Sequence, residues 1–533
     1  MSYRINIRIT AVFLVFAVAM FACVVRIYKI NTELDADTQL QSNSYSITLS
    51  PLRGTVFDCN MSPITNRETK IIATVLPTPR AITAISAVLE GEKLEGVLET
   101  LKSGAPAAVE VESEIECDDI ICTTVYKHNS SDMLAPQLIG YINGENHGVS
   151  GIEAAYDELL YTDETLKIAC AIGGDGSLLG GAEPEILGDT TVTSCGVALT
   201  INREIQRVTE RAMSEVSSGA AVVLEIGTGK IRAMVSRPDF DVTNVAEYLD
   251  DEASPLINRC LTAYNVGSAF KPCVAAAVLE QGRYKNYTCE CTGSTVVNGH
   301  TFKCHQLAGH GVMDIKTALA ESCNSFFYNI SQKVGGTAIY KMASSLNFGV
   351  GINLGGISSA DGSLTDIYTL QNSSTALANL SIGQGELLLS PVAILTLYEA
   401  IANGGVYNMP TVIEGAVKNG ILSENSRSAP TRVMSAETAD VLKEYLKEVI
   451  STGTGKAASP DLCTAGGKTA TAETGWRIEG RLVQHSWFCG FFPADNPKYA
   501  VAVLVENQTE NDSAGAPIFK KIADNITQLE NIK

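Results

Sequence analysis

The C-terminal half of the sequence predicts one α+β domain. Two observations support this prediction: β-type runs stand near both ends of that half, and helix-like runs lie between them. Ala220 to Ile226 and Lys230 to Ser236 flank a Gly-Thr-Gly segment, which is typical of a hairpin. Near the other end, Tyr499 to Val505 is an unbroken β-type run. We expect one sheet to join the two ends of this half.

Three helices are predicted beside these strands. Asn202 can cap a helix, because apolar residues recur after it at helical spacing. Pro391 to Asn403 has the composition of a helix, with proline at its start and two glycines past its end. Pro517 opens a last helix with isoleucines on one face. Such helices can cover the predicted sheet.

The chain is long enough for more than one folded unit. Its 533 residues exceed what one hydrophobic core usually covers. A composition of 45% apolar and 18% charged residues is typical of a globular protein. The formal net charge of -20 argues against a nucleic-acid partner, because phosphate binding requires clustered Lys and Arg.

Residues 1–30 are expected to form a short cytoplasmic tail and one transmembrane helix. Ile9 to Val25 is an uncharged apolar run with basic residues on both sides, and its length is at the short end of what spans a bilayer. A cleaved signal peptide is the alternative, but its possible cleavage signal at 17–19 lies inside the run. A lipoprotein cleavage site at 20–23 is disfavoured by the large Phe21.

Residues 31–195 are expected to form a separate N-terminal domain, and residues 196–533 the domain with the sheet. The N-terminal range mixes loops with short strand-like runs such as Ile71 to Val75. Gly173 to Gly181 is rich in glycine but lacks the strand-to-helix GxGxxG arrangement. We therefore interpret it as a surface loop and not as a phosphate-binding loop.

Fourteen cysteines are scattered along the chain without a regular framework. An oxidising compartment would pair most of them. Two interpretations stay open: the organism lives under reducing conditions, or a few specific pairs form.

Ser268 and Lys271 form the first of three short segments that can carry chemistry. A helix-like run follows them, so Lys271 would share a helix face with Ser268. A serine hydroxyl becomes a strong nucleophile when a base takes its proton, and a lysine with a depressed pKa can be that base. A helix start also supplies backbone donors to a developing oxyanion. Alone, the S-x-x-K pattern is weak, because it is common by chance.

The other two segments are Ser322-Cys323-Asn324 and Lys468-Thr469-Ala470-Thr471. In the second segment, the serine can relay a proton and the asparagine amide can hold a substrate amide. In the third, a lysine followed by hydroxyl groups on an edge strand suits a substrate carboxylate. The order of the three segments is more informative than any one of them.

Together they resemble the S-x-x-K, S-x-N and K-T-G signature of penicillin-binding proteins and serine β-lactamases. Other segments are similar to class B penicillin-binding proteins, which are monofunctional peptidoglycan D,D-transpeptidases. The resemblance implies a transpeptidase domain at 196–533, of the α+β class, in which an antiparallel sheet is covered by helices. It also implies that an elongated N-terminal pedestal (dimerisation-type) domain at 31–195 and one transmembrane helix precede it. The similar segments are Arg53 to Asp58, Gly148 to Glu153, Ser218 to Phe240, Ser381 to Glu386 and Trp487 to Phe491.

The resemblance also implies a role for each site residue. Ser268 would be acylated by the penultimate D-Ala carbonyl of a stem peptide, and an amine of a neighbouring stem would then form the cross-link. Lys271 would be the base for acylation. Ser322 and Lys468 would carry a proton towards the leaving amine, and Asn324 would position the substrate.

The remaining implied roles belong to the backbone and the third segment. The backbone N–H groups of Ser268 and Thr471 would form the oxyanion hole, and Thr469 and Thr471 would hold the terminal carboxylate. β-Lactams would acylate the same serine. No metal or cofactor is expected.

Ala470 departs from the family pattern, which has glycine at this position. Glycine in such a strand often marks the close approach of a ligand. The added methyl group either narrows the cleft and lowers β-lactam affinity, or is absorbed by a small shift. This departure motivates one alternative function, a catalytically weak scaffold for cell-wall assembly.

A group of cysteines and histidines precedes the second segment: Cys289, Cys291, His300, Cys304, His305 and His310. C-x-C with a further Cys-His pair is not a regular zinc spacing, so we do not expect a metal there. Cys323 lies inside the second segment. Our hypothesis is that Cys323 pairs with Cys304 and that this disulfide distorts the segment and switches the enzyme off. Two free buried thiols are the alternative.

Hydrolysis by the same fold, as in β-lactamases and D,D-carboxypeptidases, is a further alternative. The anchor and pedestal fit polymer assembly better. The resemblance implies a single-pass protein of the bacterial cell membrane with an extracytoplasmic catalytic domain. Its partners would be peptidoglycan stem peptides, β-lactams and a membrane glycan polymerase of the elongation, division or sporulation machinery.

Overall fold

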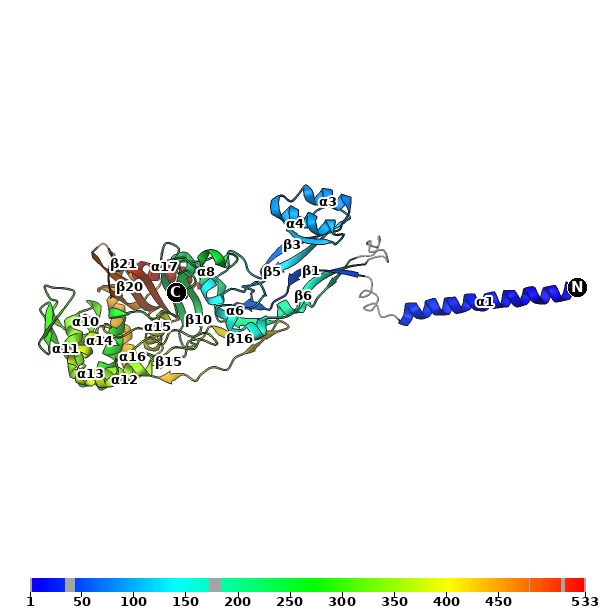
Figure 1. Cartoon of the computed structure of the whole chain (residues 1–533). Helices are drawn as coiled ribbons and strands as arrows, with labels where there is room; N and C mark the ends of the chain where they lie inside the picture. The colour runs from blue at the N-terminus through cyan, green and yellow to red at the C-terminus, as the bar shows by residue number, and fades with distance from the viewer. Residues whose placement is uncertain (1, 34–43, 172–183, 479, 510–512, 532–533) are drawn as a thin grey trace. The chain divides into compact units, whose positions relative to one another are not determined.

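The computed structural model describes residues 2–33, 44–171, 184–478, 480–509 and 513–531 (Figure 1). Contacts within the chain define two compact units. Unit 1 comprises Met1–Leu52, Thr69–Val125 and Asp163–Thr190, and unit 2 comprises Arg53–Glu68, Tyr126–Thr162 and Thr191–Lys533. Each unit consists of three separate segments of the chain, whereas the predicted domains are continuous. Their boundaries at 30 and 195 remain predictions. The glycine-rich run Gly173 to Gly181 lies outside the described residues.

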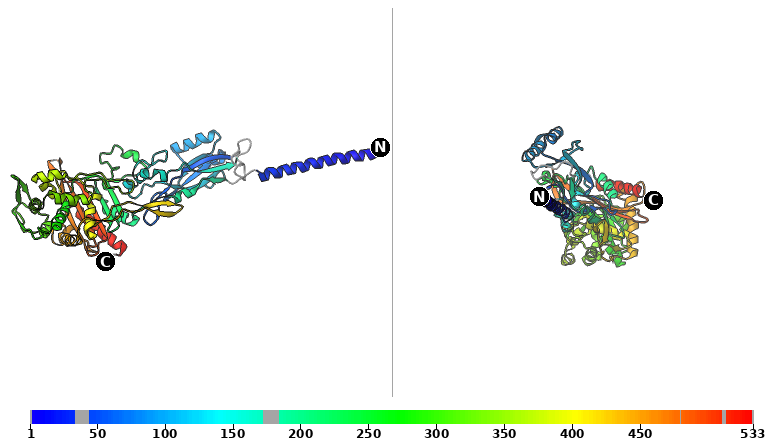
Figure 2. Two further views of the ribbon diagram at one scale, coloured as in Figure 1. Left: turned by 90° about the horizontal axis from the view of Figure 1, so that it is seen from below. Right: turned by 90° about the vertical axis from the view of Figure 1, so that its right-hand side faces the viewer.

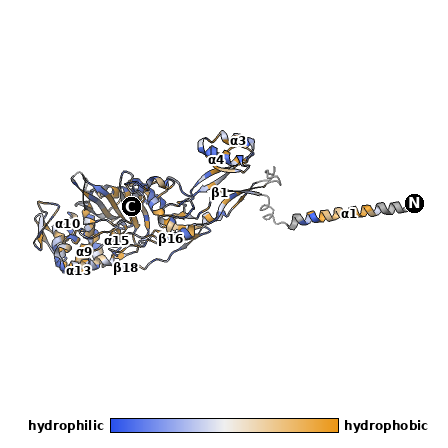
Figure 3. Ribbon diagram, viewed as in Figure 1, coloured by the Kyte–Doolittle hydropathy of each residue, from blue (hydrophilic) through white to orange (hydrophobic). Residues whose placement is uncertain are grey.

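Helix α1 (Ser2–Glu33) contains the predicted apolar run. Thr10–Lys29 has a mean hydropathy of 2.5 and is long enough to cross a membrane. Figure 3 shows hydrophobic residues along this helix. In the part of the chain that the structure describes, no other helix passes the same test of length and composition.

Unit 1 contains two three-stranded sheets. One has the order β1-β6-β7 and the other β4-β3-β5. The predicted strand Ile71 to Val75 is the second half of β3, and its buried residues pack against two short helices. The elements of this unit are β1 (Ser44–Pro51), β3 (Glu68–Val75), α3 (Pro79–Ser86), α4 (Gly91–Lys102), β4 (Ala107–Val111), β5 (Ile120–Lys127), β6 (Thr165–Ala171) and β7 (Glu185–Leu187).

The centre of unit 2 is a five-stranded antiparallel sheet of order β10-β9-β21-β20-β19. Its central strand, β21, is the last of its five strands in the sequence and pairs with β9, the first of them. This confirms that one sheet joins the two ends of the C-terminal half. The strands are β9 (Gly219–Glu225), β10 (Ile231–Arg237), β19 (Gly466–Ile478), β20 (Arg481–Phe492) and β21 (Tyr499–Gln508).

One face of this sheet is covered by α8 (Arg203–Ala212) and α17 (Gly515–Glu530). Sheet residues such as Val223 and Val503 pack against them. The side chain of Asn202 caps α8, as predicted, by accepting hydrogen bonds from the first turn. In Figures 1 and 2 helices are seen on both sides of the sheet.

The opposite face is covered by α15 (Pro391–Ala402), and α9 (Lys271–Gln281) belongs to the same hydrophobic core. Here the alternate sheet residues, such as Val222 and Leu504, point into the core. Every residue of α15 is buried, so this apolar helix belongs to the core of the unit. Ser268, which begins the first motif segment, thus lies at the start of a helix that is buried in a large hydrophobic core.

Further helices and small sheets complete unit 2. A four-stranded sheet has the order β17-β16-β8-β2, and three two-stranded ladders are β11-β14, β12-β13 and β15-β18. The helices are α5 (Pro136–Ile139), α6 (Gly151–Ala155), α7 (Asp157–Leu160), α10 (Ile315–Ala320), α11 (Asn324–Val334), α12 (Gly336–Ser345), α13 (Ile367–Asn372), α14 (Ser374–Ser381) and α16 (Ala436–Ser451). The remaining strands are β2 (Thr55–Phe57), β8 (Gly196–Leu199), β11 (Cys289–Cys291), β12 (Ser294–Val297), β13 (His300–Lys303), β14 (Gly311–Met313), β15 (Val406–Tyr407), β16 (Ile413–Lys418), β17 (Ile421–Glu424) and β18 (Thr431–Arg432).

A buried ion pair joins two of the segments on which the family resemblance rests. Arg53 Nε donates to Glu153 Oε2 at 2.7 Å, and both side chains are at most 1% exposed. The second carboxylate oxygen of Glu153 contacts His128 Nε2 at 2.9 Å. Burial alone would raise the pKa of Glu153, but His128 and Arg53 hold it below its usual value. Glu153 is therefore ionised, and it anchors Arg53 across a long sequence separation.

Candidate active site

Ser268 lies in a single 3-10 turn, Gly267–Phe270, that leads directly into α9. Gly267 has a φ of 51°, and a Cβ atom there would lie 2.6 Å from the carbonyl oxygen of Thr471. A Cβ atom at Gly383 would lie 1.9 Å from the carbonyl oxygen of Gly267. Only glycine permits these two approaches, which bring the turn against strand β19 and the Ser381 to Glu386 loop.

Two hydrogen bonds from the core fix the same turn. The buried Tyr398 hydroxyl, on α15, donates to the carbonyl oxygen of Ala269 at 2.9 Å. The Trp487 indole, on β20, donates to the carbonyl oxygen of Asn265 at 3.0 Å. The nucleophile candidate is thus held by rigid elements on both sides.

The three predicted segments meet at one cleft of about 640 Å³. Ser268, Ser322, Asn324, Thr469 and Thr471 all line it. Lys271 and Lys468 are fully buried and contact residues of the second and third segments. The other residues that line the cleft are Lys303, His305, Tyr328, Asn379, Ile382, Gln384, Gly385, Thr454, Ala470, Glu473, Gln484 and Ser513.

The Lys271 amine is surrounded by acceptors of the second segment. Nζ donates to the Ser322 carbonyl oxygen at 2.6 Å, to the Asn324 Oδ1 atom at 2.7 Å and to the Ser322 Oγ atom at 3.1 Å. Burial lowers the pKa of Lys271 to about 7. Its free-base form is therefore well populated near neutral pH, as a general base requires.

Lys468 lies on the edge strand β19 and is also fully buried. Burial and the neighbouring charge of Lys271 hold the pKa of Lys468 well below its usual value. The hydroxyl of the next residue, Thr469, lies 2.8 Å from the hydroxyl of Thr454. Thr454 was not identified from the sequence, because it follows α16 and only the folded chain brings it to β19.

Ser322 adopts the left-handed region, with a φ of 54°. It stands between α10 and α11, and Cys323 occupies the position just before the first residue of α11. This conformation costs a non-glycine residue about 1–3 kcal/mol and persists only where the surroundings hold it. The hydrogen bond from Lys271 to the Ser322 carbonyl oxygen is one such restraint.

The placement of Ser268 and Thr471 beside one cleft is compatible with an oxyanion hole made of their N–H groups, which stays a prediction. Sequence reasoning missed Glu473 and Gln484, which face the cleft from β19 and β20. They are paired across the two strands and adjoin the third segment. Glu473 stands two positions after Thr471, which was the one available signal, whereas Gln484 is brought to the cleft by its pairing with Glu473.

Ala470 is 3% exposed and pairs with Trp487 across β19 and β20. Its methyl group belongs to the main hydrophobic core, while neighbouring Thr469 and Thr471 alternate to the other side of the strand. The methyl group of Ala470 was expected either to narrow the cleft or to be absorbed by a small shift. Its burial favours the second outcome, in which the core accommodates the methyl group.

Ala470→Gly is therefore expected to cost stability and to leave β-lactam acylation nearly unchanged. Losing a buried methyl group and adding backbone freedom should lower the free energy of unfolding by about 1–2 kcal/mol. Chemical denaturation and the acylation rate constant measure the two effects. An acylation rate that rises about tenfold or more would contradict this, because a methyl group that obstructs a binding pocket is worth that much.

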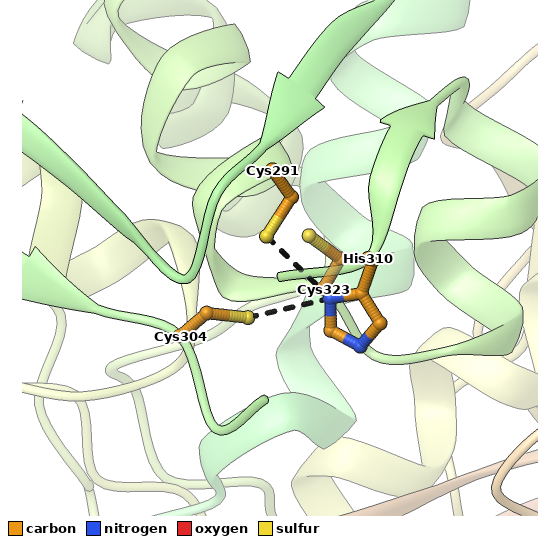
Figure 4. Close-up of side chains that lie close together, drawn as sticks. All are labelled: Cys291, Cys304, His310 and Cys323. Carbon is orange, nitrogen blue, oxygen red and sulfur yellow. Dashed lines mark hydrogen bonds between the residues drawn. The ribbon is translucent and has the colours of Figure 1, made fainter. Parts of the chain in front are cut away.

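Cys304 and Cys323, the proposed redox pair, are both buried free cysteines. Their sulfur atoms lie within 4.8 Å of each other. Figure 4 shows that they do not stand alone, because Cys291 and His310 point to the same place. The structure thus assembles a four-residue group that sequence spacing did not indicate.

Comparison with known proteins identifies the family. Residues 219–524, more than half of the chain, match the model described as "Penicillin binding protein transpeptidase domain". Penicillin-binding protein PbpB of Mycobacterium tuberculosis is 30% identical over 75% of this chain and 61% of its own length. Peptidoglycan D,D-transpeptidase PbpA of the same species is 30% identical over 63% of this chain and 73% of its own length. The chain thus spans less than two thirds of the PbpB relative.

A solved structure shares the fold. Penicillin-binding protein A from M. tuberculosis, in a ceftriaxone acyl-enzyme complex, superposes with a TM-score of 0.62 at 25% identity, covering 76% of this chain and 93% of that one. The sheet, the helices on both faces and the position of Ser268 at a helix start agree with this assignment. The chain therefore belongs to the penicillin-binding protein transpeptidase family.

Proposed function

We propose that this protein is a peptidoglycan D,D-transpeptidase that works through an acyl-enzyme on Ser268 and is inhibited by β-lactams. The observation that carries the proposal is the buried Lys271 amine, which has a pKa of about 7 and lies one helical turn after Ser268 beside the second segment. The PbpA relatives, which are named peptidoglycan D,D-transpeptidases, and the related structure, which is a ceftriaxone acyl-enzyme complex, support the same activity.

In the first half-reaction, Lys271 in its neutral form takes the proton of the Ser268 hydroxyl. The Ser268 oxygen then bonds to the penultimate D-Ala carbonyl carbon of a stem peptide, and the peptide C–N bond to the terminal D-Ala breaks. The leaving amine receives a proton through Ser322 and Lys468. The hydrogen bond of 3.1 Å between Lys271 Nζ and Ser322 Oγ supports this route.

In the second half-reaction, an amine of a neighbouring stem bonds to the same carbonyl carbon and the ester bond to Ser268 breaks. The attacking amine loses a proton to the enzyme, and the Ser268 hydroxyl is restored. Asn324 positions the substrate amide, and Thr469 and Thr471 hold the terminal carboxylate of the donor. Thr454 supports Thr469, since their hydroxyls are 2.8 Å apart. The N–H groups of Ser268 and Thr471 stabilise the oxyanion.

We further propose that α1 anchors the protein in the bacterial cell membrane with the catalytic unit outside the cytoplasm. Its apolar segment Thr10–Lys29 supports the anchor, and the location of peptidoglycan outside the membrane supports the orientation. A glycan polymerase of the membrane would supply the strands to be cross-linked.

Intact-protein mass spectrometry of the detergent-solubilised full chain after incubation with benzylpenicillin tests the acyl-enzyme. We expect one drug adduct on the native protein and none on Ser268→Ala. Ser345→Ala, at the end of α12 and outside the cleft, is the matched serine control and should keep the adduct. The measurement is made with and without reductant.

No adduct on folded native protein in either redox state, at high drug concentration, would favour the scaffold alternative instead. An adduct that persists on Ser268→Ala would remove Ser268 from the nucleophile role. An adduct seen only under reduction would support the Cys304 and Cys323 switch.

A further inference from the structure

Four metal-ligating side chains from separate segments converge beside the second segment (Figure 4). Cys291 ends strand β11, Cys304 follows β13, His310 precedes β14, and Cys323 lies between α10 and α11. Their ligand atoms all lie within 4.8 Å of one another. The three thiols are buried and the imidazole is partly buried.

The distances fit a tetrahedral metal centre. The Cys291 Sγ atom lies 3.5 Å and the Cys304 Sγ atom 3.6 Å from the His310 Nδ1 atom. With Zn–S bonds of about 2.3 Å and a Zn–N bond of about 2.0–2.1 Å, tetrahedral geometry predicts a sulfur-to-nitrogen separation of about 3.6 Å. Both measured separations agree with this value, and they share one nitrogen atom.

We propose that Cys291, Cys304, His310 and Cys323 bind one zinc ion at a closed structural site. Three thiolates and one imidazole in tetrahedral arrangement favour zinc over metals that prefer oxygen ligands or open geometries. Binding converts the three thiols to thiolates, and their three protons pass to solvent. The Zn²⁺ charge offsets two of the three negative charges that this creates.

A disulfide between Cys304 and Cys323 is the competing explanation. It would use two of the four side chains and leave Cys291 and His310 without a role in the cluster. Zinc uses all four. Since the same two sulfurs cannot form a disulfide and remain metal thiolates, oxidation and zinc binding exclude each other at this site.

The metal would position the second segment. Cys323 is the residue between Ser322 and Asn324, and both of these accept hydrogen bonds from Lys271. The other ligands lie in or directly beside the two-stranded ladders β11-β14 and β12-β13, which are too small to be stable alone. Zinc would tie these ladders to the left-handed turn at Ser322. This positioning role, unlike zinc binding itself, rests on the proposed function.

Metal analysis of the full chain, purified in detergent under reducing conditions without chelator, tests the site. We expect about one zinc ion per chain in the native protein. Cys291→Ser and His310→Gln should lower the zinc content about tenfold or more, because each removes a ligand. Cys289→Ser is the matched control, since Cys289 lies two positions away on β11 but outside the cluster, and it should keep the zinc.

Cobalt substitution gives a readout that does not depend on how the variants fold. After the zinc is removed with a chelator, the reduced native protein titrated with Co²⁺ alone should develop the intense near-ultraviolet thiolate-to-cobalt absorption, which added Zn²⁺ then abolishes. No zinc together with no cobalt absorption in reduced, folded protein would overturn the proposal. Loss of zinc from Cys289→Ser equal to that from Cys291→Ser would overturn the ligand assignment.

Benzylpenicillin acylation of the same samples separates the two hypotheses. Ser268→Ala should lose acylation and keep its zinc. A native protein that binds zinc but is never acylated contradicts the transpeptidase proposal alone. One that is acylated but binds neither metal contradicts the zinc proposal alone. Removal of zinc is expected to slow acylation and to lower the melting temperature, and unchanged values of both would overturn the positioning role.

Discussion

Lys271→Met is expected to lower the rate constant for acylation of Ser268 by benzylpenicillin about a thousandfold, within the range that general-base catalysis supplies. Methionine has a similar length and no basic group, so the substitution removes the proton acceptor and fills the same space. The side chain is fully buried and its amine contacts only a few acceptors, so no solvent-exposed group can replace it. Stopped-flow measurement of acylation quantifies the loss.

The pH dependence distinguishes a base from a merely structural lysine. A lysine acts as a base only when neutral, and burial lowers the pKa of Lys271 to about 7. The native rate constant should therefore rise as the pH increases through about 7 and then level off, and Lys271→Met should lose this rise. Lys316→Met, on the exposed side of α10, is the control and should behave as the native protein. A native rate without any rise between pH 6 and 8 would contradict the assigned role.

Glu153→Ala is expected to lower the free energy of unfolding of unit 2 by about 3–5 kcal/mol, because it leaves Arg53 as a buried charge without its main partner. The carboxylate is 0% exposed and also contacts His128. The remaining partner of Arg53, Asp157 at 2.8 Å, is more exposed and cannot replace it fully. Urea denaturation followed by tryptophan fluorescence measures the change, since Trp487 is buried in unit 2.

Two further variants serve as comparisons for Glu153→Ala. Glu153→Gln keeps an acceptor for the Arg53 side chain and should lose less stability than Glu153→Ala. Glu158→Ala removes an exposed carboxylate on the neighbouring α7 and should change stability by less than about 0.5 kcal/mol. A loss below about 1 kcal/mol in Glu153→Ala would show that Asp157 alone compensates Arg53.

Local patterns predicted the sheet and its helices because they are set by neighbouring residues. The cap at Asn202, the glycine-containing hairpin and the apolar face of the last helix all act within a few positions of one another. The contact between Arg53 and Glu153 joins segments that are far apart in the chain, and no periodic pattern in the sequence predicts it. For the same reason the sequence suggested simple domain boundaries, whereas the contacts interleave two units.

The site was predictable where order along the chain was sufficient. Ser268, Ser322 and Thr469 were expected at one site from a known motif order, and all three line one cleft. The motif order does not indicate the buried state of Lys271 and its lowered pKa, which depend on packing. Nor does the spacing of Cys291 and His310 reveal that Cys323, beyond a helix, completes their cluster.

The strand order of the main sheet sets the order in which it can form during synthesis. Strand β21 separates β9 from β20 and pairs with both, yet it follows the other four strands of this sheet in the sequence. Until residues up to Gln508 have emerged, the hairpin of β9 and β10 has an apolar edge with no native neighbour. Pairing over such a long sequence separation is slow. The nascent chain therefore has to be kept from aggregating until β21 has emerged, and a product cut short before Tyr499 cannot join β9 to β20.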